Sequence, residues 1–222
     1  MTEVEYTEID QGPGAELCAP MDRALLMIRE RRFAAAERVV DAMLASFDVL
    51  IQQEGGIPLS VANQEQYDQL RAASPEPENL VPLDFCYQAV MHWKAFLRSE
   101  QGDFSGALST LEQEARIAPT AAAPFVERGF VLNRMSRFSE AKDAYERALD
   151  ITYRFPLSAP QRPMALRGLG YALVELGDLL AAEKAFIESL ELDPDNELAI
   201  RELEYIHSLR NQEEEDAARR DR

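Results

Sequence analysis

Residues 165–194 read ALRGLGYALVELGDLLAAEKAFIESLELDP, and this stretch decides the fold. Apolar and small residues recur at helical spacing on both sides of Gly177-Asp178, which predicts two helices joined by a tight turn. Gly170 lies in the middle of the first helix, Ala182 lies early in the second, and Phe186 follows one turn later. Antiparallel helices pack closely only where side chains are small, so Gly170 and Ala182 mark the crossing and Phe186 fills the space beside it.

Two upstream segments, residues 89–119 and 125–151, repeat this pattern. Each has a small residue in its first helix, a turn, an aromatic residue, an alanine and then a large apolar residue. The matching residues are Ala95, Gly102-Asp103, Phe104, Ala107 and Leu111, then Gly129, Ser136-Arg137, Phe138, Ala141 and Tyr145. The spacing from Ala107 to Ala141 is 34 residues, and from Ala141 to Ala182 it is 41, so about seven extra residues lie near 154–160.

This pattern resembles the tetratricopeptide repeat family, whose period is about 34 residues. The resemblance covers residues 85–194 and implies an all-α fold, a right-handed superhelical stack of helix hairpins closed by a C-terminal capping helix. Three repeats are expected at 85–119, 120–153 and 161–194, and the capping helix at 195–211. The apolar stripe of Leu198, Leu203, Ile206 and Leu209 fits that capping role.

The rest of the chain is expected to be less regular. Residues 17–52 form a degenerate hairpin in which Ala24, Phe33 and Ala36 fall in the matching places, although Pro20 replaces the usual large residue. Residues 53–84 are expected to be an insertion with a short helix from about 61 to 73 and an extended proline-rich link. Residues 1–16 should be flexible and the charged tail 212–222 solvated or frayed.

In the resembling family, the first helix of each pair lines a concave groove in which partner segments bind. The alignment places the following groove residues there: His92, Phe96, Val126, Phe130, Asn133, Arg134, Arg167, Tyr171 and Val174. Phe96, Phe130 and Tyr171 occupy the same place in three successive repeats and form a predicted aromatic ladder. Arg134 and Arg167 suggest a ligand with apolar anchors and at least one carboxylate. Alternatively, the aromatic residues pack against neighbouring repeats and the arginines pair with local glutamates.

Some family members hold the carboxylate terminus of chaperone partners with a lysine-and-asparagine clamp. The matching positions in this chain are occupied by other residues, none of which supplies these donors: Met21, Leu25, Trp93, Ala123 and Glu127. The sequence therefore argues against that partner class.

Composition limits the other classes of function. The chain has 222 residues with 40 acidic and 23 basic side chains, a net charge of −17, which disfavours nucleic acid and anionic membrane surfaces as partners. No stretch approaches the roughly 20 apolar residues that cross a bilayer. The acidic N-terminus does not read as a secretory signal, so a cytoplasmic, bacterial-type protein is expected.

No catalytic, cofactor or metal site is expected. Cys18 and Cys86 fit a reducing compartment without a disulfide framework, and with His92 and His207 they have no metal-ligand spacing. Phosphate-loop and nucleophile-elbow motifs are absent from the sequence.

These observations favour a non-enzymatic adaptor or scaffold that binds a protein or peptide partner. Two alternatives stay open: a secretion-type chaperone for a client protein, and the regulatory subunit of an enzyme complex that binds through convex or edge surfaces and the 52–84 insertion. Phe155 and Leu157 in the long turn are candidates for homodimer contacts. Val4, Tyr6 and Ile9 lie among Glu3, Glu5, Glu8 and Asp10, and this acidic segment is a candidate ligand for the groove of its own chain or for that of a neighbouring molecule.

Overall fold

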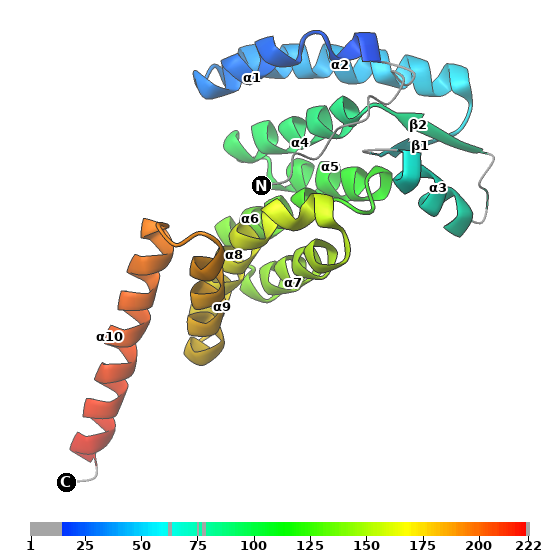
Figure 1. Ribbon diagram of the computed structural model, residues 1–222. Coiled ribbons are helices and arrows are strands. Elements are labelled where there is room, and N and C mark those ends of the chain that lie inside the picture. The colour runs from blue at the N-terminus through cyan, green and yellow to red at the C-terminus, as the bar shows by residue number, and fades with distance from the viewer. Residues whose placement is uncertain (1–14, 62–63, 75, 77–78, 221–222) are drawn as a thin grey trace. The chain divides into compact units, whose positions relative to one another are not determined.

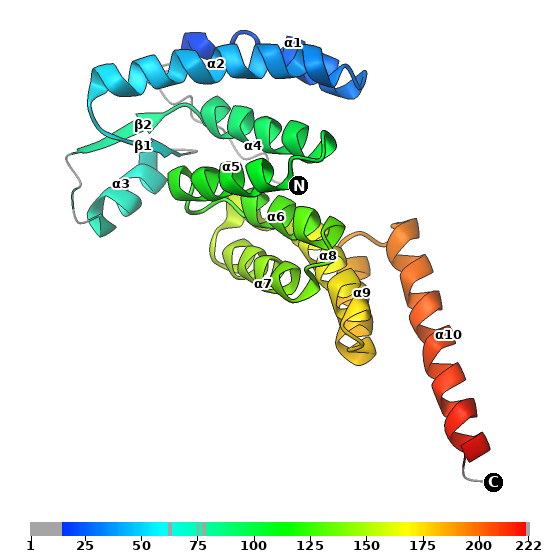
Figure 2. The same cartoon turned by 180° about the vertical axis from the view of Figure 1, so that it is seen from behind.

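The computed structural model describes residues 15–61, 64–74, 76 and 79–220, and most of the segment 1–16 lies outside these residues. The chain divides into two compact units, Met1–Pro119 and Thr120–Arg222. Helices dominate both units, as Figures 1 and 2 show from opposite sides. In the described part of the chain, no helix is long and apolar enough to cross a membrane.

Unit 1 contains two helix hairpins separated by a small β–α–β segment. Its elements are η1 (Ala15–Cys18), α1 (Met21–Arg29), α2 (Phe33–Glu54), β1 (Ile57–Ser60), α3 (Gln64–Ala73), β2 (Leu80–Leu83), α4 (Phe85–Glu100) and α5 (Phe104–Ile117). Ala24, Ala36, Val40, Val90 and Leu97 are fully buried and join α1 and α2 to α4 in one core.

Unit 2 contains two further hairpins and a long last helix. Its elements are α6 (Ala123–Arg134), α7 (Phe138–Arg154), η3 (Pro156–Gln161), α8 (Arg162–Glu175), α9 (Leu179–Leu192) and α10 (Glu197–Arg220). Ala199 and Ile206 of α10 are fully buried against Leu173, Ala182 and Phe186. The helix continues to Arg220, so much of the tail that was expected to be solvated or frayed has helical backbone.

The insertion is more ordered than an extended link. β1 and β2 form a parallel two-stranded sheet in which Ile57 pairs with Leu80 and Ser60 with Leu83, and α3 connects the two strands. Parallel strands require such a crossover connection. Pro58 and Pro82 are tolerated because each strand of a two-stranded sheet has a free edge. Within the described residues, this sheet is the one departure from an all-helical chain.

Glycine at the helix crossings makes room for large rings. A Cβ atom added at Gly129 would lie 2.6 Å from the ring of Tyr145, and one at Gly168 would also meet this ring. Gly170 makes the same room for Phe186, at 2.7 Å. Burial raises the pKa of the Tyr145 hydroxyl, and the nearby Glu127 carboxylate raises it further. The glycines of α6 and α8 therefore make room for the aromatic rings of Tyr145 in α7 and Phe186 in α9.

The seven extra residues after α7 are accommodated by η3. The Ser158 hydroxyl in this turn donates to the Thr120 carbonyl oxygen at 2.7 Å and accepts from the Ala122 backbone N–H at 3.2 Å. Both bonds are buried and join the turn to the start of α6. Phe155 is half-buried beside η3, whereas Leu157 is exposed.

Each hairpin turns through one residue with left-handed backbone. These residues are Arg31 (φ 57°), Gly102 (φ 83°), Ser136 (φ 56°) and Gly177 (φ 80°). After the two glycines, an aspartate caps the next helix: Asp103 accepts from the Gly106 N–H at 2.9 Å and Asp178 from the Ala181 N–H at 3.1 Å. The turns at Arg31 and Ser136 have the same backbone without glycine, which strains them.

The turn at Ser136 offers a stabilising substitution. We expect Ser136→Gly to raise the free energy of unfolding by about 1 kcal/mol, because glycine adopts positive φ without the Cβ penalty. Urea unfolding measured by circular dichroism tests this expectation. Ser139→Gly, which places glycine inside α7 a few residues later, should instead destabilise the chain by about 1 kcal/mol. Equal effects from the two substitutions would refute the backbone argument.

Candidate partner-binding surface

Three exposed aromatic residues occupy equivalent positions in unit 2. Phe130 lies on α6, Tyr171 on α8 and Tyr205 on α10, and their exposed fractions are 47%, 41% and 51%. Position 171 follows position 130 by 41 residues, and position 205 follows 171 by 34, which are the spacings of the repeat. We call Phe130, Tyr171 and Tyr205 the aromatic row. Because equivalent positions of stacked repeats project to the same side, the row forms one surface.

Tyr205 is the member that the sequence analysis missed. The signal was present, because α10 continues the repeat: Ala199 and Ile206 are buried as Ala165 and Ala172 are in α8, 34 residues earlier. From the sequence, only a capping role is predicted for this helix. Its first three turns are in fact equivalent to the first helix of a further repeat.

Charges of opposite sign surround the two ends of the aromatic row. The Arg134 guanidinium carbon lies 5.9 Å from the centre of the Phe130 ring, a cation–π distance. Partial burial, together with the Glu175 and Glu202 carboxylates, raises the pKa of the Tyr171 hydroxyl. Arg134 therefore lies at the α6 end of the row, and two carboxylates lie near Tyr171 in the part between α8 and α10.

Packing from α7 holds the middle of the row in place. The Phe138 ring meets the Tyr171 ring edge-on, with centroids 6.4 Å apart. Asn133, half-buried on α6, points its amide nitrogen toward the Tyr145 hydroxyl and the Gly168 carbonyl, each at 3.5 Å. Its Oδ1 atom is buried and has no hydrogen-bond partner among the described residues.

The two expected groove residues of unit 1 pack within that unit. Nδ1 of His92 lies 3.2 Å from Oε2 of Glu114, a fully buried carboxylate on α5. The Phe96 ring is half-buried and packs edge-on against Phe33 of α2, with centroids 6.0 Å apart. Phe96 therefore fills space between helices, which is the alternative that the sequence left open.

Three expected groove residues of unit 2 are also used internally. Val126 is buried, and Val174 packs half-buried against the core beneath α8 and α9. The Arg167 guanidinium pairs with Asp193 at 3.0 Å and donates to the Ser189 hydroxyl at 3.3 Å. We predicted Arg167 as a ligand for a partner carboxylate, but it already has one within the unit.

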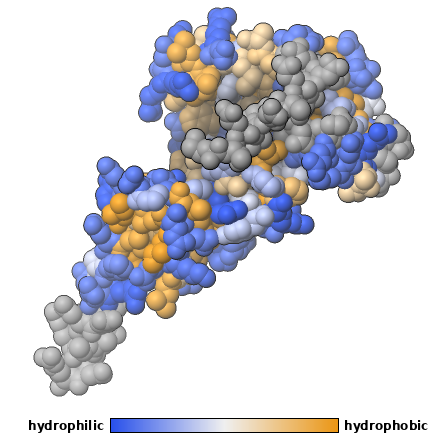
Figure 3. All heavy atoms as spheres, viewed as in Figure 1, coloured by the Kyte–Doolittle hydropathy of each residue, from blue (hydrophilic) through white to orange (hydrophobic). Residues whose placement is uncertain are grey.

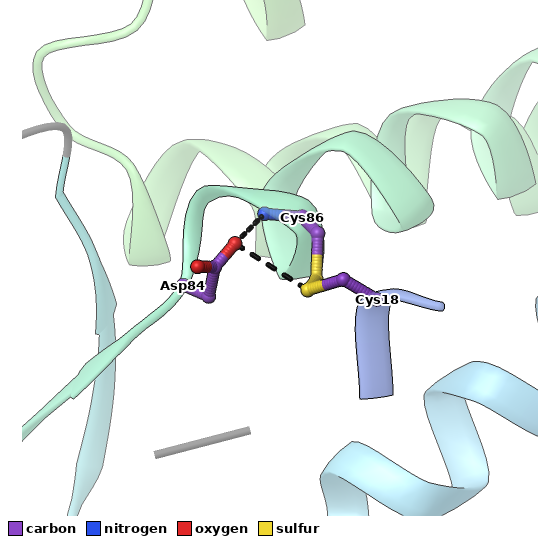
Figure 4. Close-up of side chains that lie close together, drawn as sticks. All are labelled: Cys18, Asp84 and Cys86. Atoms are coloured by element: carbon purple, nitrogen blue, oxygen red, sulfur yellow. Dashed lines mark hydrogen bonds between the residues drawn. A yellow bond between two sulfur atoms is a disulfide. The ribbon is translucent and has the colours of Figure 1, made fainter. Parts of the chain in front are cut away.

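The two cysteines correct the expectation of free thiols. Cys18 of η1 and Cys86 of α4 form a disulfide across 68 positions of sequence (Figure 4). Oδ1 of Asp84 accepts from the Cys86 backbone N–H at 2.9 Å and lies 3.4 Å from the Cys18 sulfur. In the described residues, these three side chains are the one cluster with metal-ligand geometry. Cysteine binds a metal ion as its thiolate, and the disulfide provides no thiolate.

Other exposed apolar residues lie outside the aromatic row. Figure 3 shows hydrophobic surface gathered over the part of unit 2 that α9 and α10 build. Leu180 and Ile187 of α9 are 67% and 46% exposed, and Leu198 of α10 is 52% exposed. These residues provide matched controls for substitutions in the row.

Comparison with known proteins places the repeat in a family. Residues 168–196, which include most of α8 and all of α9, match the family model of the tetratricopeptide repeat. A curated relative, the Protein CTR9 homolog of Arabidopsis thaliana, is 29% identical over 135 residues. That match covers 60% of this chain, and the chain spans only 12% of the relative's length.

Solved structures share the fold at low sequence identity. The MamA RS-1 ArsTM double mutant matches 93% of this chain and 90% of its own with a TM-score of 0.58 at 14% identity. The first tetratricopeptide domain of human RPAP3 matches 58% of this chain and 95% of its own, with a TM-score of 0.52 at 22% identity. The first such domain of Spaghetti (RPAP3), bound to the HSP90 peptide SRMEEVD, matches 55% and 91% with a TM-score of 0.50 at 22% identity. These matches confirm the all-α stack of helix hairpins expected from the sequence, and residues 168–196 match the tetratricopeptide repeat itself.

Proposed function

We propose that the chain is a non-enzymatic adaptor whose unit 2 binds an extended segment of a partner protein across the aromatic row. The observation that supports this proposal is the exposure of Phe130, Tyr171 and Tyr205 at equivalent positions of α6, α8 and α10. Large aromatic side chains are normally buried, and interfaces use them as anchors because they contribute contact area with little loss of side-chain freedom.

The charges around the row define the chemistry of the partner segment. Arg134 beside Phe130 favours a carboxylate in the segment at the α6 end. Glu175 and Glu202 beside Tyr171 favour a lysine or arginine between α8 and α10. The segment would thus carry apolar side chains for the row, an acidic residue at one end and a basic residue toward the other.

The Spaghetti (RPAP3) domain shows that a peptide can bind to a domain of this fold. Clamp positions such as Glu127 would repel the terminal carboxylate of the peptide SRMEEVD. We therefore expect it to bind this chain poorly, and it serves as a specificity control. The proposal includes neither nucleic acid nor membrane, in keeping with the net charge of −17.

A cytoplasmic location belongs to the same proposal, on the strength of the acidic composition. The two cysteines no longer support it, because they form a disulfide and disulfides are typical of oxidising compartments. Measurement of free thiols in cells by alkylation would decide between the cytoplasm and an oxidising compartment. Alkylation in denaturant, before any reductant is added, would modify both cysteines if they are free thiols, because unfolding exposes the buried Cys86. Complete alkylation under these conditions would favour the cytoplasm.

Substitution of two row residues tests the binding surface. We expect Tyr171→Ala/Tyr205→Ala to weaken partner binding by about 2 to 4 kcal/mol, roughly 30-fold or more, because each truncation removes an apolar anchor. The measurement is quantitative mass spectrometry of proteins captured from a lysate by each variant, followed by titration of the purified partner. Circular dichroism establishes first that each variant folds.

The matched control is Leu180→Ala/Ile187→Ala, which truncates exposed apolar residues of α9 in the same unit. This control should retain the partner, since α9 carries no residue of the row. Loss of the partner from the control with retention by the row variant would move the binding surface to α9 and overturn the proposal. A captured client that aggregates when the chain is omitted would identify the adaptor as a chaperone.

A further inference from the structure

A separate groove lies in unit 1, between α2 on one side and η1 and α1 on the other. Its volume is about 550 Å³, and apolar side chains form its floor, among them Met27, Val39 and Met43. Leu17 and Pro20 close the side opposite α2. The groove contains none of the residues of the aromatic row and belongs to a different unit from it.

Three arginines line this groove on a strongly acidic chain: Arg23, Arg32 and Arg38. Arg32 pairs with Glu30 at 2.9 Å, and both side chains are exposed. For Arg23 and Arg38, the described part of the chain provides no ion pair. Glu16 is the single carboxylate that lines the groove. The groove therefore combines an apolar floor with an excess of positive charge, while the chain as a whole carries −17.

We propose that this groove is the binding site of residues 1–14 of the same chain, MTEVEYTEIDQGPG. The segment carries four carboxylates and no basic side chain, which complements Arg23 and Arg38. Val4 and Tyr6 are spaced so that an extended backbone directs both to one side, toward the apolar floor, while Glu3 and Glu5 point to the other. The segment thus matches the groove in both charge and hydropathy.

Chain connectivity favours binding within one molecule. The segment continues directly into Glu16 and Leu17, which line the groove. Tyr6 and Glu16 are ten positions apart, enough for an extended reach of about 33 Å, whereas the groove-lining stretch from Arg32, just before α2, to Ser46 is about 21 Å long. A short connection within one chain corresponds to an effective concentration of roughly millimolar, so even a weak site would be occupied.

Photo-crosslinking in the full chain tests the proposal. Tyr6→p-benzoylphenylalanine places a reactive benzophenone at the proposed anchor, and benzophenone reacts readily with methionine C–H groups. Irradiation of the dilute protein and digestion should give adducts chiefly with peptides that contain Met27 or Met43, within one chain. Adducts mainly on α4, α5 or unit 2, adducts between chains, or no adduct would overturn the proposal.

Charge reversal distinguishes the groove from chance proximity. In the crosslinking variant, Arg23→Glu/Arg38→Glu should reduce the adduct yield about tenfold through like-charge repulsion. Arg29→Glu/Arg71→Glu, which changes the charge equally at exposed positions outside the groove, should leave the yield unchanged. If the groove variant fails to fold, raising NaCl from about 0.05 to about 0.5 M on the unreversed chain replaces it and should lower the yield several-fold. A yield that is insensitive to both charge and salt would refute the proposed recognition.

Discussion

Reduction of the Cys18–Cys86 disulfide is expected to lower the free energy of unfolding of unit 1 by about 4 kcal/mol. The bond closes a loop of 68 positions, and cross-linking a loop of that size removes much conformational freedom from the unfolded chain. Without the bond, η1 would be held to α4 only by packing. The effect should be large because small native proteins have a total stability of only about 5 to 15 kcal/mol.

Urea unfolding with and without a phosphine reductant measures this effect, and alkylation with mass spectrometry counts the free thiols. Cys18→Ser/Cys86→Ser should have the stability of the reduced protein and should not respond to reductant. If the oxidised chain contained two alkylatable thiols before any reduction, the disulfide would be absent. The two thiolates and the Asp84 carboxylate would then form a candidate metal site, which titration with Zn²⁺ would test.

Replacement of the Glu114 carboxylate should destabilise unit 1 by about 3 to 5 kcal/mol in the Glu114→Ala variant. The side chain is fully buried on α5, and its two oxygens accept from different groups of α4. Nε2 of Gln88 donates at 3.3 Å, and Nδ1 of His92 lies at 3.2 Å. Truncation would remove this acceptor from Gln88 and His92 and would create a cavity in the core.

Glu112→Ala is the matched control, since Glu112 lies on the same helix but is exposed and pairs with Arg116. That exposed pair should contribute less than about 1 kcal/mol. Glu114→Gln retains the volume and one acceptor oxygen, so its cost should fall between the two. Chemical denaturation of all three variants tests the order. Equal stabilities for Glu114→Ala and Glu112→Ala would show that the buried carboxylate has no structural role.

These two predictions concern unit 1, where the sequence was least informative. There the degenerate hairpin lacks the repeat's proline and glycine signals, and Pro20 occurs where a large residue is usual. The structure shows instead that this unit is held by a disulfide, a buried carboxylate and the ion pair of Lys94 with Glu37 at 2.7 Å. None of these has a periodic signature.

The sequence by itself determined the helix hairpins, their turns and the positions of the aromatic residues. This information is local: Gly102-Asp103 and Gly177-Asp178 specify a left-handed turn and a helix cap, and a 34-residue period recurs whatever the surroundings. The same period contained Tyr205, which we overlooked because we assigned its helix a capping role.

Only the tertiary structure decided which of these residues remain exposed. Phe96 and Phe130 occupy equivalent places in the repeat, yet Phe33 packs on the first, whereas the second is 47% exposed. Arg167 meets Asp193 from 26 positions away, and Cys18 meets Cys86 across 68. A repeat pattern specifies the direction of each side chain from its own helix. The neighbours of a side chain come from other helices. Its burial, its ion pairs and the bonded state of the cysteines therefore depend on how the chain packs.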